Sequence, residues 1–262
     1  MTNLRRADAD TTIALMYHAV GVEGGPGLDP HYAVGSSLFA AHMQACVEQS
    51  GAVVCAREWL DGRGGVIVTF DDGHESNYRV AWPALAAVGG RADFFVNPAQ
   101  VGTDGFATWA ALREMADAGM SVQSHGWDHR HYLTELSPDN LREELRRARL
   151  DIEDHVGRPV TLLAPPGGRC PAGLDCIARE VGYSHVLNSR PASISRRRPR
   201  VNLGRFAVTS RLDVATLEAW LCTGSARLKM QARYSFLAVA KRVLGDRVYE
   251  EVRHGLLGKT TL

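Results

Sequence analysis

The sequence predicts an α/β protein built as a closed or nearly closed β/α barrel, and three observations support this prediction. Short apolar runs that are typical of buried strands alternate with helical patterns along most of the chain. The chain has 262 residues, of which 45% are hydrophobic and 23% are charged, which suits one large domain with a single core. Polar residues directly follow several of the apolar runs, and in a β/α barrel such positions lie on the face that carries active sites.

The expected strands and helices alternate in a regular order. The strands are expected at residues 12–17, 52–55, 66–70, 92–96, 121–124, 161–164, 185–187 and 205–208. The helices are expected at residues 36–49, 76–88, 108–118, 138–155, 174–181 and 213–221. Ser36 or Ser37 is expected to cap the first helix, and Gly51 is expected to end it. Ser137 is expected to cap the fourth helix, which ends at Gly157.

The barrel is expected to occupy residues 1–221, and residues 222–262 are expected to form a C-terminal helical extension. This extension has the pattern of a helical hairpin or of a bent amphipathic helix that is broken near Gly245. It is expected to pack on the barrel or on a partner. Because it combines Lys and Arg with apolar residues, peripheral contact with an anionic membrane is an alternative.

The overall composition excludes some partners. Thirty Lys and Arg against 29 Asp and Glu give a net charge of +1, so no strong field attracts nucleic acid, which is not expected as a partner. An Arg-rich segment at 196–200 is expected to grip substrate phosphates or to be a solvated loop. The first residues lack the apolar run of a signal peptide, so a cytoplasmic location is expected. The five cysteines include no CxxC pair, which predicts reduced and mostly buried thiols.

Two groups of residues predict a metal site. Asp71 and Asp72 stand at the end of the expected strand 66–70, where successive side chains diverge, although Asp-Asp-Gly is also common in turns. His125 and His129 are four residues apart, so both imidazoles can reach one ion, although such a pair can also lie in an exposed polar loop. Two histidines with one carboxylate from another strand end suit a divalent ion and leave positions open for water and substrate.

Three motifs of the chain resemble those of the polysaccharide deacetylases of the NodB-homology type, which form carbohydrate esterase family 4. The motifs are Thr69-Phe70-Asp71-Asp72-Gly73, His125-x-x-x-His129 and Ala164-Pro165-Pro166-Gly167-Gly168. The resemblance covers residues 12–210 and implies a distorted (β/α)7 barrel. It also implies that Asp71 is the general base, that Asp72, His125 and His129 are the metal ligands, and that a backbone N–H beside Pro166, for which we choose Gly167, binds the oxyanion.

The chain departs from the pattern of this family in three ways. Gly126 stands where the family usually has Ser or Thr. Ala164 stands where many members have an Arg that pairs with the base, and Arg190 is either a substitute for it or an ordinary surface residue. The Leu-x-His motif that supplies a general acid in many members has no good match. Instead, Leu15-Met16-Tyr17-His18-Ala19-Val20 resembles the start of circularly permuted members, so His18 is expected to protonate the leaving amine, with His185 as the fallback.

The resemblance implies a metal-dependent hydrolase that removes the acetyl group from an N-acetylated sugar. Because the first residues lack the apolar run of a signal peptide, a role in cytoplasmic glycan or glycoconjugate biosynthesis is expected. Zn is the first choice of ion, and Ni, Co and Fe are alternatives. Trp127 is expected either to line the sugar site or to be part of the core. Two other functions stay open, namely hydrolysis of a non-sugar amide on the same barrel and sugar binding by a catalytically inactive homologue.

Overall fold

A computed structural model describes residues 10–244 except 23, 27, 130–132 and 199, and it describes the side chains of the last helix as far as residue 236. The strands are β1 Thr11–Thr12, β2 Ala14–Tyr17, β3 Ala19–Val20, β4 Ala33–Val34, β5 Val53–Val54, β6 Val66–Phe70, β7 Asp93–Val96, β8 Ser121–Ser124, β9 Leu162–Leu163, β10 His185–Asn188, β11 Ile194–Ser195 and β12 Asn202–Ala207. The α-helices are α1 Ser36–Ser50, α2 Ala56–Leu60, α3 Trp82–Ala87, α4 Trp109–Asp117, α5 Pro138–Val156, α6 Leu174–Glu180, α7 Val214–Cys222 and α8 Gly224–Leu244. Short segments of other helix types span Asn77–Ala81, Leu133–Glu135 and Pro166–Gly168.

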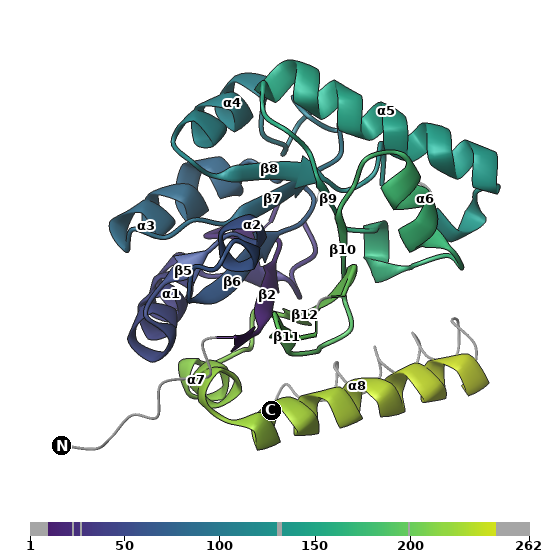
Figure 1. Ribbon diagram of the computed structural model, residues 1–262. Coiled ribbons are helices and arrows are strands. Elements are labelled where there is room, and N and C mark those ends of the chain that lie inside the picture. The colour runs from purple at the N-terminus through teal and green to yellow at the C-terminus, as the bar shows by residue number, and fades with distance from the viewer. Residues whose placement is uncertain (1–9, 23, 27, 130–132, 199, 245–262) are drawn as a thin grey trace.

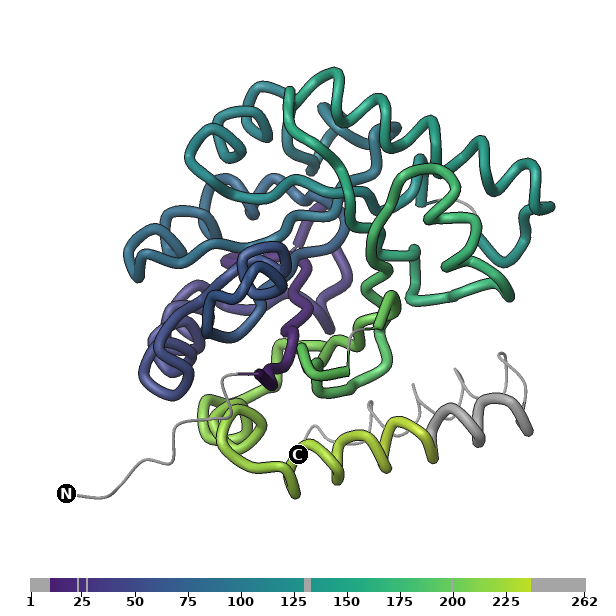
Figure 2. Tube along the Cα trace, in the orientation of Figure 1, coloured from purple at the N-terminus to yellow at the C-terminus, as the bar shows by residue number. Residues whose placement is uncertain are grey.

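Within the described residues, a parallel sheet closes on itself and is surrounded by helices (Figure 1). The strand order around the ring is β2-β12-β10-β9-β8-β7-β6, and β6 pairs with β2 to complete it. Strand β5 adds a short pairing to the beginning of β6. Figure 2 shows the closure in the chain trace, because β12 near the end of the barrel lies beside β2 at its beginning. The expected (β/α)7 barrel is therefore confirmed.

Along each barrel strand, successive side chains point alternately into the interior of the barrel and outward toward the surrounding helices. In β6, Val66 and Val68 belong to the hydrophobic layer beneath the helices, whereas Ile67 belongs to the layer inside the barrel. A strand has a side-chain period of two, so Thr69 and Asp71 continue the interior row toward the carboxyl end of the strand. The fold thus aims Asp71 into the barrel.

The sequence correctly predicts the limits of several helices. Ser137 caps α5 by accepting a backbone N–H at 3.3 Å, and Gly157 ends this helix with a φ of 70°. Gly51 ends α1 with a φ of 82°. The prediction for the start of α1 is wrong, because the N-cap is Gly35 and the two serines expected to cap it lie inside the helix.

Two further expectations are wrong in detail. The last barrel strand spans Asn202–Ala207 rather than residues 205–208. Of the five thiols, Cys46 and Cys55 are buried, whereas the other three are exposed. The thiols are all unpaired, as expected, but most of them are not buried.

Helix α8 extends beside the barrel as a long arm (Figure 1). It is continuous, and the expected break near Gly245 lies outside the described residues. Ala226 and Met230 pack against the core, whereas Leu228 and Phe236 are 65% and 74% exposed. In the part of the chain that the structure describes, none of the helices has the length and apolarity needed to cross a bilayer. The expected division between barrel and extension stays a prediction.

Candidate active site

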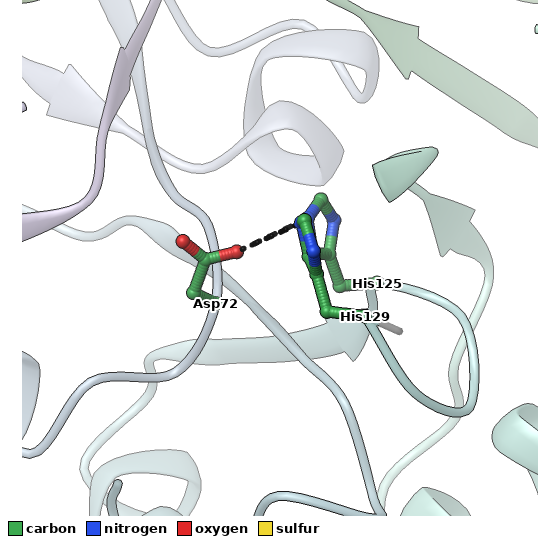
Figure 3. A group of neighbouring side chains, drawn as sticks. All are labelled: Asp72, His125 and His129. Carbon is green, nitrogen blue, oxygen red and sulfur yellow. Dashed lines mark ion pairs between the residues drawn. The ribbon is translucent and has the colours of Figure 1, made fainter. Parts of the chain in front are cut away.

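Asp72, His125 and His129 converge at the carboxyl ends of β6 and β8 (Figure 3). Oδ1 of Asp72 lies 3.3 Å from Nε2 of His125 and 3.6 Å from Nε2 of His129. One potential ligand atom from each of the three residues lies within 4.8 Å of the others. Among the described residues, Oδ1 of Asp72 is buried without a hydrogen-bond partner. Two imidazole nitrogens and this carboxylate oxygen fit a divalent transition-metal ion, because Zn is bound by such a set in proteins.

The turn after β6 directs the two neighbouring carboxylates to different places. Asp72 has a φ of 73°, in the left-handed region that Asp tolerates better than most residues. Gly73 also has a φ of 73°, and a Cβ atom at this position would lie 3.0 Å from Cγ1 of Val96. Only glycine fits this backbone without strain. The turn therefore separates Asp72, beside the histidines, from Asp71, which stays inside the barrel.

The loop that joins the two histidines begins with a glycine for a structural reason. His125 is buried at the end of β8, and its N–H donates to the carbonyl of Val96 at 2.9 Å. Gly126 follows with a φ of 80°, and its N–H donates to the hydroxyl of Ser124 at 3.2 Å. Because side chains rarely adopt this φ, glycine rather than Ser or Thr suits the position.

Asp71 forms a buried ion pair with Arg205, a contact that the sequence analysis did not predict. Nη1 of Arg205 lies 2.6 Å from Oδ1 of Asp71, and Nη2 donates to Oδ2 at 2.8 Å. Nη1 also donates to the hydroxyl of Thr69 at 3.1 Å, and the arginine side chain is fully buried. A guanidinium that engages both oxygens of a carboxylate holds its orientation firmly.

Arg205 reaches Asp71 because both side chains belong to the interior of the barrel. In β12, Leu203 packs inside the barrel and Phe206 packs beneath the helices, so Arg205 shares the interior side with Leu203. The hypothesis that Arg190 pairs with the base is wrong, because Arg190 is exposed and Arg205 occupies both oxygens of Asp71. An arginine at an inward position of a barrel strand was the available signal, since a buried charge needs a partner.

The surrounding charges keep both carboxylates ionised. Burial by itself would raise the pKa of Asp71, but the guanidinium of Arg205 and the ring of His125 outweigh burial and hold the pKa below its ordinary value. Burial would likewise raise the pKa of Asp72, and the imidazoles of His125, His18 and His129 lower it further than burial raises it. An ionised Asp72 can bind a metal ion, and an ionised Asp71 can accept a proton.

His18 directly follows β2, which pairs with β6 in the barrel. Its ring stacks on Tyr32 with the ring centroids 4.6 Å apart. Nδ1 of His18 is buried without a hydrogen-bond partner among the described residues. The side chain lines a small pocket of about 50 Å³ together with Asp72, Asp29 and His74. This placement is compatible with the expected role of His18 as general acid, which stays a prediction.

The structure places the remaining predicted residues in different surroundings. Pro166 is buried in the loop after β9, and Gly167 has a φ of 60° there. Trp127 is half-buried, and the guanidinium of Arg147 lies 3.5 Å from its ring centroid. His185 begins β10, at the end of the barrel opposite the site, so this structure does not support it as the fallback acid.

Arg196, the first residue of the Arg-rich segment, also lies at the opposite end of the barrel, where its N–H donates to the carbonyl of Asp10. This arginine follows β11, which pairs with β1 ahead of the first barrel strand. Arg196 donates from Nε to the carbonyl of Trp59 at 2.7 Å, and its guanidinium lies 4.2 Å from the centroid of the Trp59 ring. Arg196 is thus held against Trp59 away from the site, and the suggestion that the segment grips substrate phosphates stays a prediction without support from these contacts.

Comparisons with known proteins bear on the same residues. A family model described as polysaccharide deacetylase matches residues 61–186, which include Asp71, Asp72, His125, His129 and Pro166 but neither His18 nor Arg205. The Bacillus subtilis protein named "Putative polysaccharide deacetylase YxkH" is 26% identical over 215 residues, covering 79% of this chain and 75% of that protein.

Solved structures of deacetylases share the fold. A polysaccharide deacetylase from Bacillus cereus has a TM-score of 0.72 and 24% identity, covering 80% of this chain and 69% of its own. The Streptococcus pyogenes deacetylase PplD, solved in complex with acetate, has a TM-score of 0.72 and 23% identity, covering 80% of this chain and 98% of its own. IcaB from Ammonifex degensii has a TM-score of 0.68 and 26% identity, covering 82% of this chain and 98% of its own.

Proposed function

We propose that this chain is a metal-dependent N-deacetylase that removes the acetyl group from an N-acetylated sugar, because a polysaccharide deacetylase family model matches residues 61–186 and a relative named as a putative polysaccharide deacetylase is 26% identical. The observation that carries the proposal is the convergence of Asp72, His125 and His129 beside Asp71, a second ionised carboxylate that Arg205 holds in place. Three ligands from two strand ends and one separate base are the parts that metal-assisted amide hydrolysis requires.

Each residue of the site has a separate role in the proposed amide hydrolysis. Asp72, His125 and His129 would hold a divalent ion, which when bound supplies a Lewis acid that polarises the amide carbonyl. Asp71 accepts the proton of the attacking water while Arg205 keeps its carboxylate oriented. His18 donates a proton to the nitrogen of the leaving amine. A backbone N–H in the Pro166–Gly168 segment, for which Gly167 is our choice, stabilises the oxyanion.

The proposed activity is tested by measuring acetate release. The protein is stripped with a chelator, reloaded separately with Zn, Ni, Co or Fe, and assayed with nucleotide-linked, lipid-linked and oligomeric N-acetylhexosamines and with simple acetamides. We expect acetate from at least one sugar substrate, with activity that is lost on stripping and regained on reloading. Release from simple amides alone would support the non-sugar alternative. No release from any substrate by metal-loaded protein would support an inactive sugar-binding homologue.

The general-acid assignment has its own test. In His18→Ala, we expect kcat to fall by about 10²-fold or more, because general acid–base catalysis typically contributes 10²–10⁴-fold. Metal content should stay at the wild-type level, because the three expected ligands are unchanged. Metal analysis and steady-state kinetics on the same sample give the two values. Unchanged kinetics would remove His18 from the mechanism.

We further propose that the substrate is an intermediate of cytoplasmic glycan or glycoconjugate biosynthesis.

We also propose that α8 lies on an anionic lipid surface. The sequence of α8 contains five Lys and Arg residues and no Asp or Glu. Lys229 and Arg233 are exposed near Leu228 and Phe236, two large apolar side chains that are also exposed. A basic helix with apolar residues in water suits anionic lipids.

Vesicle sedimentation tests the membrane contact. We expect the protein to sediment with vesicles that contain anionic lipid, and to bind less as salt rises or when Leu228 and Phe236 are both changed to Ser. Binding to neutral vesicles alone, or wild-type binding by the double variant, would contradict the proposal. Absence of any binding would leave packing on the barrel or on a partner as the role of α8.

A further inference from the structure

Helix α5 holds the loop that carries the second histidine of the expected metal site. Oε1 of Glu144 accepts the backbone N–H of Trp127 at 2.9 Å, and the Glu144 carboxylate also accepts the N–H of Asp128. The carbonyl of Trp127 accepts the N–H of Ala99 at 3.1 Å. The backbone of Trp127, in the middle of the loop, is thus held both at its N–H and at its carbonyl.

A second contact from α5 reaches the same loop one turn further along. The guanidinium of Arg147 lies 3.5 Å from the centroid of the Trp127 ring. At Gly126, a Cβ atom would stand 3.8 Å from Oε1 of Glu144 and 3.4 Å from the ring of Pro166. The loop therefore runs in a narrow space between α5 and the Pro-Pro-Gly-Gly segment, and Glu144 is the acidic group that lines this space.

The two histidines differ in what fixes them. His125 is buried, and its N–H bonds to the neighbouring strand β7. His129 is one-third exposed and lies five residues beyond Ser124, the end of β8, so the path of the loop determines where its imidazole stands. We infer that Glu144 is a positioning residue for His129, and that it sets the metal affinity of the site through its hydrogen bonds to the loop backbone. This inference rests on the proposed metal-dependent function.

Metal affinity is the test, measured with Zn in competition against a chromogenic chelator and with Co through its visible spectrum. Groups that orient metal ligands typically contribute 10–100-fold to affinity, so we expect Glu144→Ala to weaken Zn binding by about 10-fold or more and to alter the Co spectrum. Glu144→Gln, which keeps an oxygen acceptor of the same length, should recover most of the loss. The matched control is Glu143→Ala, since Glu143 is exposed and pairs with Arg146 at 2.8 Å.

Two further variants separate positioning from general destabilisation. Glu144→Asp keeps the charge but shortens the side chain, so it should also weaken Zn binding; if Glu144→Ala does not fold, Glu144→Asp decides the test. In the His129→Ala background, Glu144→Ala should cause no further loss, because the residue through which Glu144 acts is already absent.

The outcomes distinguish this inference from the proposed function. If Glu144→Ala and Glu144→Asp bind Zn as tightly as wild type and Glu143→Ala, Glu144 does not position the loop, although the metal site stands. An equal further loss in the His129→Ala background would also overturn the inference, because Glu144 would then act elsewhere. If the wild-type protein binds no metal under any loading condition, the proposed function itself fails.

Discussion

Asp71→Asn is expected to remove deacetylase activity while leaving the metal ion bound. Asparagine has nearly the same shape as aspartate but cannot take the proton of the attacking water, and loss of a general base typically lowers the rate by 10²–10⁴-fold. The expected metal ligands, Asp72, His125 and His129, are unchanged. The measurements are kcat with the substrate found by acetate release and the Zn content of the same preparation.

The control for this variant is His125→Ala, which should lose both metal and activity because it removes a buried nitrogen from the expected ligand set. The pair of variants separates the base from the ligands. Turnover by Asp71→Asn at nearly the wild-type rate would show that Asp71 is not the base. Loss of metal from Asp71→Asn would show instead that the ion depends on both carboxylates.

The parts of the site that the sequence predicts are those that lie next to strand ends. Asp72, His125 and His129 each follow an apolar run, and in a closed parallel barrel the carboxyl ends of all strands meet on one face. The convergence of these three residues therefore needs only the order of the strands and the place where each one ends. An error of one or two residues in a strand limit does not change it.

Arg205 could not be found in the same way, because its role depends on register. The expected strand began at residue 205, which placed this arginine at the edge of the barrel rather than in its interior. Strand β12 begins at Asn202, and the three added residues show that Leu203 and Arg205 share the inward side. Its partner Asp71 is 134 residues away in the sequence, and only the ring order brings the two strands near each other.

The role of Glu144 could not be predicted from the sequence for a different reason. It lies in α5 among several acidic and basic residues, and Glu143 beside it forms an ordinary exposed ion pair. What distinguishes Glu144 is that it accepts backbone N–H groups from the 125–129 loop. Every residue except proline has a backbone N–H, so the sequence of side chains does not indicate which N–H groups the Glu144 carboxylate will bind.

Arg205→Met is expected to lower the free energy of unfolding by about 3–5 kcal/mol at neutral pH, since removing one partner of a buried ion pair leaves the other charge uncompensated. Methionine fills a comparable space without a charge. The loss should depend on pH, and the sign follows from Asp71. In the wild type its pKa is lowered, so its contribution to stability is present above the unfolded value of about 3.9 and is lost as pH falls through the lower folded value.

Without the guanidinium, burial becomes the dominant influence on Asp71 and raises its folded pKa. The variant should then lose stability as pH rises above about 3.9, so its deficit relative to wild type should be larger at pH 8 than at pH 4. Denaturant unfolding at the two pH values measures this difference. The double variant Arg205→Met with Asp71→Asn removes both charges and should be destabilised by less than the sum of the single changes. Additive losses, or a deficit independent of pH, would mean that the ion pair does not hold Asp71 in its ionised state.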